Sequence, residues 1–168
     1  MNHVYKGAVI AVTALLLAGC DTTPAGPRTV DNEGRAVVQA PEAVALFMKA
    51  CFRPGATQSG MKRAIAADKN ITDKGGVEGF ILARHSSKAI SLVSVSDGNC
   101  AVSFDSGAAP ETAAKEAIVQ VIPQVKPTGF GGKKGGGQVT MKTAKGTVVV
   151  TNNQKRKSQG ATISLYKR

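Results

Sequence analysis

The chain of 168 residues carries 22 Lys and Arg against 11 Asp and Glu, a net charge of +11, and its length suits one domain with a short extension. Hydrophobic residues make up 42% and charged residues 20%, which is ordinary globular usage and argues against wholesale disorder or a coiled coil. Aromatic residues are only 4%, with no Trp, which argues against a stacking platform for single-stranded nucleic acid.

The amino-terminal residues have the pattern of an export signal. Residues 8–17 (AVIAVTALLL) form an apolar run behind Lys6. As a helix this run would span about 15 Å, which is half of a hydrocarbon core about 30 Å thick. It is too short to cross a bilayer, but it has the length of the apolar segment of a secretory signal. Residues 1–19 are therefore predicted to be a cleaved signal peptide.

The signal ends in Leu17-Ala18-Gly19-Cys20, which resembles the lipobox of bacterial lipoproteins. The resemblance implies cleavage before Cys20, a diacylglyceryl thioether on its sulfur, and acylation of the new amino terminus, for example with palmitate. Two or three acyl chains, at about 0.8 kcal/mol per buried CH₂, would form a firm anchor facing the periplasm. Asp21 resembles an inner-membrane retention signal and favours the inner over the outer membrane. The alternative is an ordinary secretory signal with an accidental Cys.

Behind the signal, residues 20–39 are rich in Thr, Pro and Gly and are predicted to be a flexible tether for a single domain of residues 40–168. The predicted elements are helices at 41–52 and 59–68, strands at 79–85, 88–96 and 100–104, a helix at 110–122 ended by Pro123, and strands at 138–143, 147–152 and 161–167. Short connections between strands predict an α+β fold of order α-α-β-β-β-α-β-β-β. About three helices would pack on a mostly antiparallel sheet of about six strands. Beyond residue 20 the chain resembles only exported proteins of Gram-negative bacteria without an assigned activity.

Two cysteines remain once Cys20 is assigned to lipid. An exported chain enters an oxidising compartment, where leftover thiols tend to pair. Cys51 ends an apolar helix face that begins at Val44 with the spacing i, i+3, i+4 and i+7, so it is expected to face inward. A disulfide between Cys51 and Cys100 is therefore predicted. The alternative is a pair of buried thiols outside bonding distance.

Asp97-Gly98 is a strong signal for a two-residue hairpin turn between the second and third predicted strands. Directly opposed residues share a sheet face. This turn would place on one apolar face Val93, Val95, Cys100, Val102 and Phe104. The opposite face would then carry three further apolar residues, Ile81, Ile90 and Leu92. Either a bulge near residues 92–93 or a sheet covered on both faces would explain why apolar residues fall on both faces.

The sequence offers little material for catalysis. His85 is the only histidine after the predicted signal, and no G-x-S-x-G motif accompanies it. One His and two paired Cys cannot supply a zinc site, so no metal or other cofactor is expected. The glycine-rich residues 129–137 differ from a phosphate-binding P-loop, because Lys134 stands where Ser or Thr is required and a strand follows. The protein is predicted not to be an enzyme. The alternative is a small periplasmic hydrolase in which His85 works with a carboxylate or with Ser86, Ser87 or Ser91.

The charge is unevenly distributed, because residues 120–168 contain ten Lys and Arg and no Asp or Glu. Two clusters fall in predicted loops at the same end of the sheet: Lys133, Lys134, Lys155, Arg156 and Lys157. Such a patch attracts anionic lipid head groups at about 1 kcal/mol per residue near a membrane surface. We therefore expect a non-catalytic envelope lipoprotein whose basic C-terminal region contacts anionic lipid, an envelope polymer or an acidic protein, and not nucleic acid. The alternative is a basic surface that only keeps the domain soluble.

Overall fold

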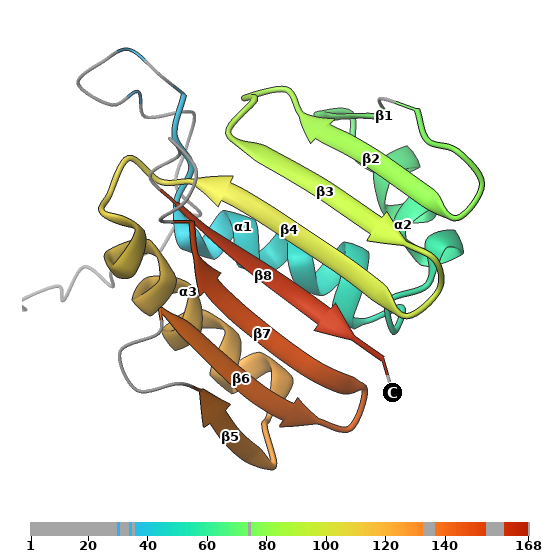
Figure 1. Ribbon diagram of the computed structural model, residues 1–168. Coiled ribbons are helices and arrows are strands. Elements are labelled where there is room, and N and C mark those ends of the chain that lie inside the picture. Colours follow the sequence, from blue (N-terminus) through green and yellow to red (C-terminus); the bar gives the residue numbers. More distant parts are fainter. Residues whose placement is uncertain are drawn as a thin grey trace, which may run out of the picture.

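The computed structural model describes residues 30, 34, 36–73, 75–132, 137–153 and 160–167. In this part of the chain, eight strands form one antiparallel sheet whose order is β1-β2-β3-β4-β8-β7-β6-β5 (Figure 1). The elements are α1 (Ala40–Phe47), the π-helical turn η1 (Met48–Phe52), α2 (Gln58–Ala66), β1 (Ile71–Asp73), β2 (Phe80–His85), β3 (Ile90–Val95), β4 (Asn99–Asp105), α3 (Pro110–Val125), β5 (Gly129–Gly132), β6 (Gln138–Thr143), β7 (Gly146–Asn152) and β8 (Gly160–Tyr166).

The sheet consists of two four-stranded meanders, each preceded by helix, which meet where β4 pairs with β8. The helices pack behind the sheet in the view of Figure 1, and the described part of the chain places no helix on the front face. The expected α+β class, with three helices on one side of an antiparallel sheet, is confirmed. The described residues form two more strands than predicted.

The two strands missing from the prediction, β1 and β5, are the edges of the sheet. β1 has three residues and β5 has four, of which three are glycines. An edge strand pairs on one side only, so a short segment with little β propensity can join a sheet that its neighbours have already formed. β1 is too short, and β5 is too rich in glycine, to leave an alternating pattern in the sequence.

The pairing of β3 with β4 differs from the predicted register by one residue. Leu92 pairs with Val102, and Ser94, not Val95, pairs with Cys100. Residues 96–98 form a three-residue loop, in which Ser96 and Gly98 have φ of 55° and 116°. The prediction of a two-residue turn, and with it an apolar face containing Val93 and Val95, is therefore wrong.

The observed register explains which apolar residues of the first meander face the helices. The helix-facing residues of the first meander are fully or almost fully buried: Ile81, Ala83, Ile90, Leu92, Cys100, Val102 and Phe104. Val95 is 46% exposed on the opposite face. Neither a bulge nor a second covered face is needed, because all seven residues lie on the face that the described helices cover.

The prediction that Pro123 ends the third helix is also wrong, since α3 continues to Val125. Proline has no N–H to donate to the carbonyl four residues earlier, that of Val119. Val119 is 67% exposed, so water can reach its carbonyl group. The helix ends at Lys126, whose φ of 48° is left-handed. A proline in the last turn on the solvent side is therefore tolerated.

The packed domain begins before the first helix. Val37 and Val38, which the sequence analysis placed at the end of the tether, are 5% and 3% exposed. The Val38 N–H donates to the carbonyl of Asp105 at 2.9 Å, which holds this segment against the end of β4. The predicted signal peptide, Cys20 and Asp21 lie outside the described residues. The helices that are described are too short or too polar for any of them to span a membrane.

Candidate functional site

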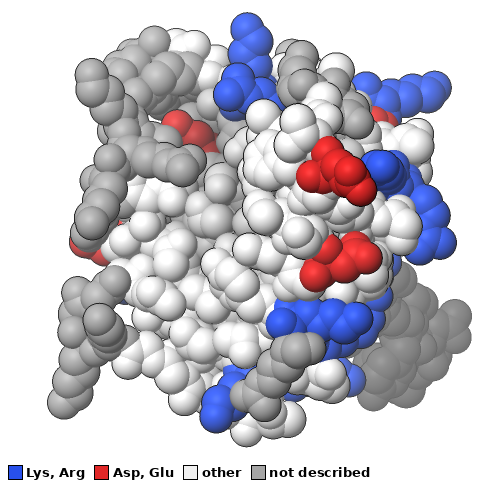
Figure 2. All heavy atoms as spheres, turned by 45° about the vertical axis from the view of Figure 1, so that its right-hand side comes forward, with Lys and Arg blue, Asp and Glu red and all other residues white. Residues whose placement is uncertain are grey.

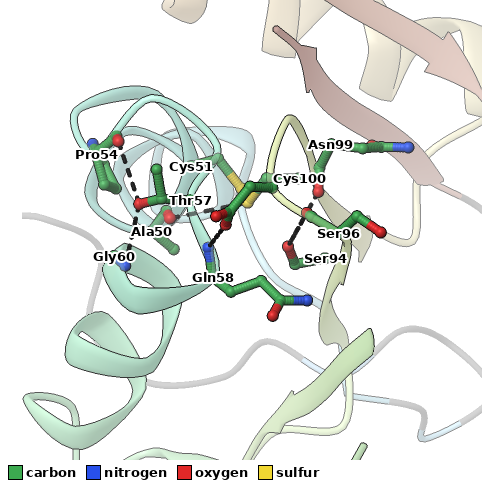
Figure 3. Close-up of a disulfide and its surroundings, with 11 residues drawn as sticks. Ala50, Cys51, Pro54, Thr57, Gln58, Gly60, Ser94, Ser96, Asn99 and Cys100 are labelled. Atoms are coloured by element: carbon green, nitrogen blue, oxygen red, sulfur yellow. Dashed lines mark hydrogen bonds between the residues drawn. A yellow bond between two sulfur atoms is a disulfide. The ribbon is translucent and has the colours of Figure 1, made fainter. Parts of the chain in front are cut away.

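The predicted disulfide is present. The sulfurs of Cys51 on η1 and Cys100 on β4 are bonded at 2.00 Å, and both residues are fully buried (Figure 3). Nearby, the backbone N–H of Gln58 at the start of α2 donates to the carboxylate of Asp97 at 2.7 Å. The disulfide joins the helical layer to β4, and the Gln58 contact joins it to the β3–β4 loop. Because the disulfide is buried within the core, we assign it a structural role.

The two predicted basic clusters, Lys133-Lys134 and Lys155-Arg156-Lys157, lie outside the described residues. The residues that flank them are described. Asn152 N–H donates to the carbonyl of Gly137 at 2.9 Å, and Asn153 N–H donates to the carbonyl of Gly160 at 3.0 Å. The two segments therefore leave and re-enter the sheet at the same end, between β5 and β6 and between β7 and β8. Binding by these clusters stays a prediction.

His85 lies at the end of β2 with its side chain 13% exposed. Its Nδ1 is 2.9 Å from the hydroxyl of Ser87 and accepts the Ser87 backbone N–H at 3.3 Å. A neutral ring with Nδ1 as acceptor carries its proton on Nε2, which is 3.9 Å from a carboxylate oxygen of Glu42 on α1. The structure thus brings together a serine, the histidine and an acid. Ser91 belongs to the opposite sheet face, since it pairs with Arg84.

This arrangement is better suited to closing a turn than to attacking a substrate. Ser87 is only 6% exposed, and its hydroxyl accepts the N–H of Ala89 at 3.2 Å. A cavity of about 190 Å³ beside it is lined by Glu42 and His85, but Ser87 does not reach its wall. Within the described residues, no group of three or more His, Cys, Asp or Glu could hold a metal ion.

A larger basic cleft lies at the other end of β6, β7 and β8 from Gly137 and Asn152. It has a volume of about 480 Å³ and is lined by Arg53, Pro54, Gly55, Thr143, Ala144, Lys145, Gly146 and Lys167. Three of these residues are cations and none is an acid. Figure 2, which turns the right-hand ends of these strands forward, shows basic side chains in the lower part of the face, acidic side chains above these, and further basic side chains along the upper and right-hand edges.

Three separate parts of the chain position these cations. Arg53 directly follows η1, Lys145 lies in the two-residue turn between β6 and β7, and Lys167 directly follows β8. The Lys167 N–H donates to the carbonyl of Gly98 at 2.7 Å, which holds the end of β8 against the β3–β4 loop. Gly146 allows the turn to pack here, because a Cβ on it would lie 2.3 Å from the Tyr166 carbonyl oxygen.

Lys145 is the best fixed of the three cations. Its ammonium group donates to the backbone carbonyl of Arg53 at 2.5 Å and lies 5.5 Å from the ring centroid of Phe52. Sequence reasoning missed the cleft because Arg53 and Lys145 are 92 positions apart and no local pattern connects them. Lys145 and Lys167 belong to the acid-free residues 120–168, and this composition indicates a basic surface but not a cleft.

Comparison of the chain with protein-family models, with curated proteins and with solved structures gave no match.

Proposed function

We propose that the protein is a lipid-anchored module of the bacterial cell envelope that binds an anionic partner and catalyses no reaction. The observation that carries the proposal is the charge of residues 120–168, with ten Lys and Arg and no acid. Acyl chains on Cys20 would hold the domain beside a bilayer, where each nearby Lys or Arg adds about 1 kcal/mol of attraction to anionic head groups. The first partner to test is therefore an anionic membrane surface, before an envelope polymer or an acidic protein.

The topology supports a shared role for the two loop clusters. Their flanking residues meet at one end of the sheet, through the bond from Asn152 to Gly137. Charges brought to one end of a domain act together on a flat anionic surface, and their attraction falls as salt rises.

The triple variant K155E/R156E/K157E tests the proposal. In the mature chain with Cys20→Ser, which removes the acyl anchor, we expect binding to vesicles containing anionic lipid at low salt. Loss of three cations should weaken this binding by at least about 100-fold, since each contributes about 1 kcal/mol. Co-sedimentation with vesicles over a series of NaCl concentrations measures both the affinity and its salt dependence.

The matched control is K62E/R63E/K69E, which changes the charge equally at three exposed cations on and just after α2. This control should lose far less affinity than the loop variant. Equal losses would mean that only net charge matters. Unchanged binding and salt dependence in the loop variant would show that the loop clusters are idle and would contradict the proposal.

The contacts of His85 with Ser87 and Glu42 favour one second candidate, a small hydrolase. Our proposal predicts that a fluorophosphonate probe will not label the folded protein, because the Ser87 hydroxyl is buried and already bonded. Mass spectrometry of the treated protein checks this. Labelling that is abolished by both Ser87→Ala and His85→Ala would support the hydrolase instead.

A further inference from the structure

We propose that the basic cleft formed by Arg53, Lys145 and Lys167 is a binding site for a phosphate group. The inference goes beyond the proposed function, because it concerns residues at the opposite end of the sheet from the two loop clusters. β6 separates the two ends by six residues, or about 20 Å. The cleft can therefore bind its ligand whether or not the loop clusters bind anything.

The charge of the cleft favours an anion. Arg53, Lys145 and Lys167 line it, and no acidic side chain is among the described lining residues. Asp97, on the neighbouring β3–β4 loop, does not line the cleft, and its carboxylate already accepts the N–H of Gln58. Three exposed cations that line one cleft favour a multiply charged anion over a single carboxylate, because each adds its own attraction.

The cleft is also partly preorganised. The contacts of Lys145 with the Arg53 carbonyl and the Phe52 ring fix the position of its ammonium group. An ammonium group has three N–H donors, and the bond to Arg53 uses one, so two can point toward a ligand. A donor that is already held in place loses less conformational freedom on binding, which favours affinity. The guanidinium group of Arg53 adds planar paired donors of the kind that suit phosphate oxygens.

The size of the cleft narrows the class of ligand. Its volume of about 480 Å³ exceeds what a bare phosphate ion needs, and the cleft is open to solvent, so a substituent on the phosphate can extend out of it. The cleft therefore fits a phosphate monoester with a small organic substituent. Such a group can come from a free metabolite or from a lipid head group.

The test uses the mature chain with Cys20→Ser and two probes, glycerol 3-phosphate and vesicles containing phosphatidic acid. We expect saturable binding of at least one probe, with amide chemical-shift changes confined to Arg53, Gly55, residues 143–146 and residue 167. Lys145→Gln and Lys167→Gln should each weaken this binding about tenfold. The matched control is Lys142→Gln, which removes an exposed lysine of β6 that does not line the cleft and should change the affinity less than twofold.

The outcomes separate this inference from the proposed function. Binding of glycerol 3-phosphate indicates a free phosphate monoester, whereas binding of the vesicles alone, lost in Lys145→Gln, indicates a lipid head group. In either case K155E/R156E/K157E should retain the chemical-shift changes in the cleft. The inference is overturned if neither probe saturates, or if Lys145→Gln and Lys167→Gln both bind as well as Lys142→Gln.

Discussion

Replacing both Cys51 and Cys100 by alanine should lower the free energy of unfolding by about 4 kcal/mol. The disulfide joins residues 49 positions apart, and a cross-link over a loop of that length removes about 4 kcal/mol of entropy from the unfolded chain. A domain of this kind has a total stability of about 5–15 kcal/mol, so the loss is a large fraction of it. Urea unfolding followed by circular dichroism measures the change.

Reduction provides the control for this prediction. A reductant should lower the unfolding midpoint of the wild-type protein toward that of the double variant, and it should leave the double variant unchanged. The bond also joins η1 to β4, so its loss should loosen the packing of α1 and η1 on the sheet more than the pairing of β7 with β8. A destabilisation below about 1 kcal/mol would contradict the stabilising role that we assign to the disulfide.

Leu92→Ala should cost about 2–5 kcal/mol of stability, whereas Val93→Ala should cost less than about 1 kcal/mol. Leu92 is fully buried against the helices, so its truncation leaves a cavity in the core. Val93 lies on the opposite face, where the described chain places no helix, and is only partly buried. Urea unfolding of the two neighbouring variants compares the two faces of one strand.

This pair of variants tests the register of β3 directly. The two-residue turn at Asp97-Gly98 would put Val93 opposite Val102 on the core face, and the order of the two losses would then be reversed. A larger loss for Val93→Ala than for Leu92→Ala would therefore contradict the three-residue loop at residues 96–98.

Patterns within single elements were sufficient to predict most of the helical layer. Met61 and Ile65 lie on the buried side of α2, and Lys62 and Arg63 are exposed, as the helical spacing indicates. Pro41 lies in the first turn of α1, as expected for a residue without a backbone N–H. The inward direction of Cys51 follows from the same periodicity, and it made the disulfide with Cys100 predictable.

Features that depend on partners elsewhere in the chain were not predictable. The face of the sheet on which Val93 lies depends on the number of residues in the loop that follows β3. A change of one residue in this loop moves every side chain of the strand to the other face. The Asp97-Gly98 pair indicates a turn but does not fix its length. The edge strand β5 exists because β6 offers it unpaired backbone groups, although its own glycines give no β pattern.

Periodicity, composition and charge are local properties, and they were enough to predict the α+β class, the inward faces of the helices and the acid-free character of the last third. The cysteine pairing followed from the expected export of the chain and the inward direction of Cys51. The register at Leu92, the two edge strands and the cleft of Arg53, Lys145 and Lys167 became visible in the folded chain alone. Backbone pairing and the grouping of distant charges depend on which segments meet in space. No local pattern around Arg53 specifies that it meets a turn 92 positions later in the chain.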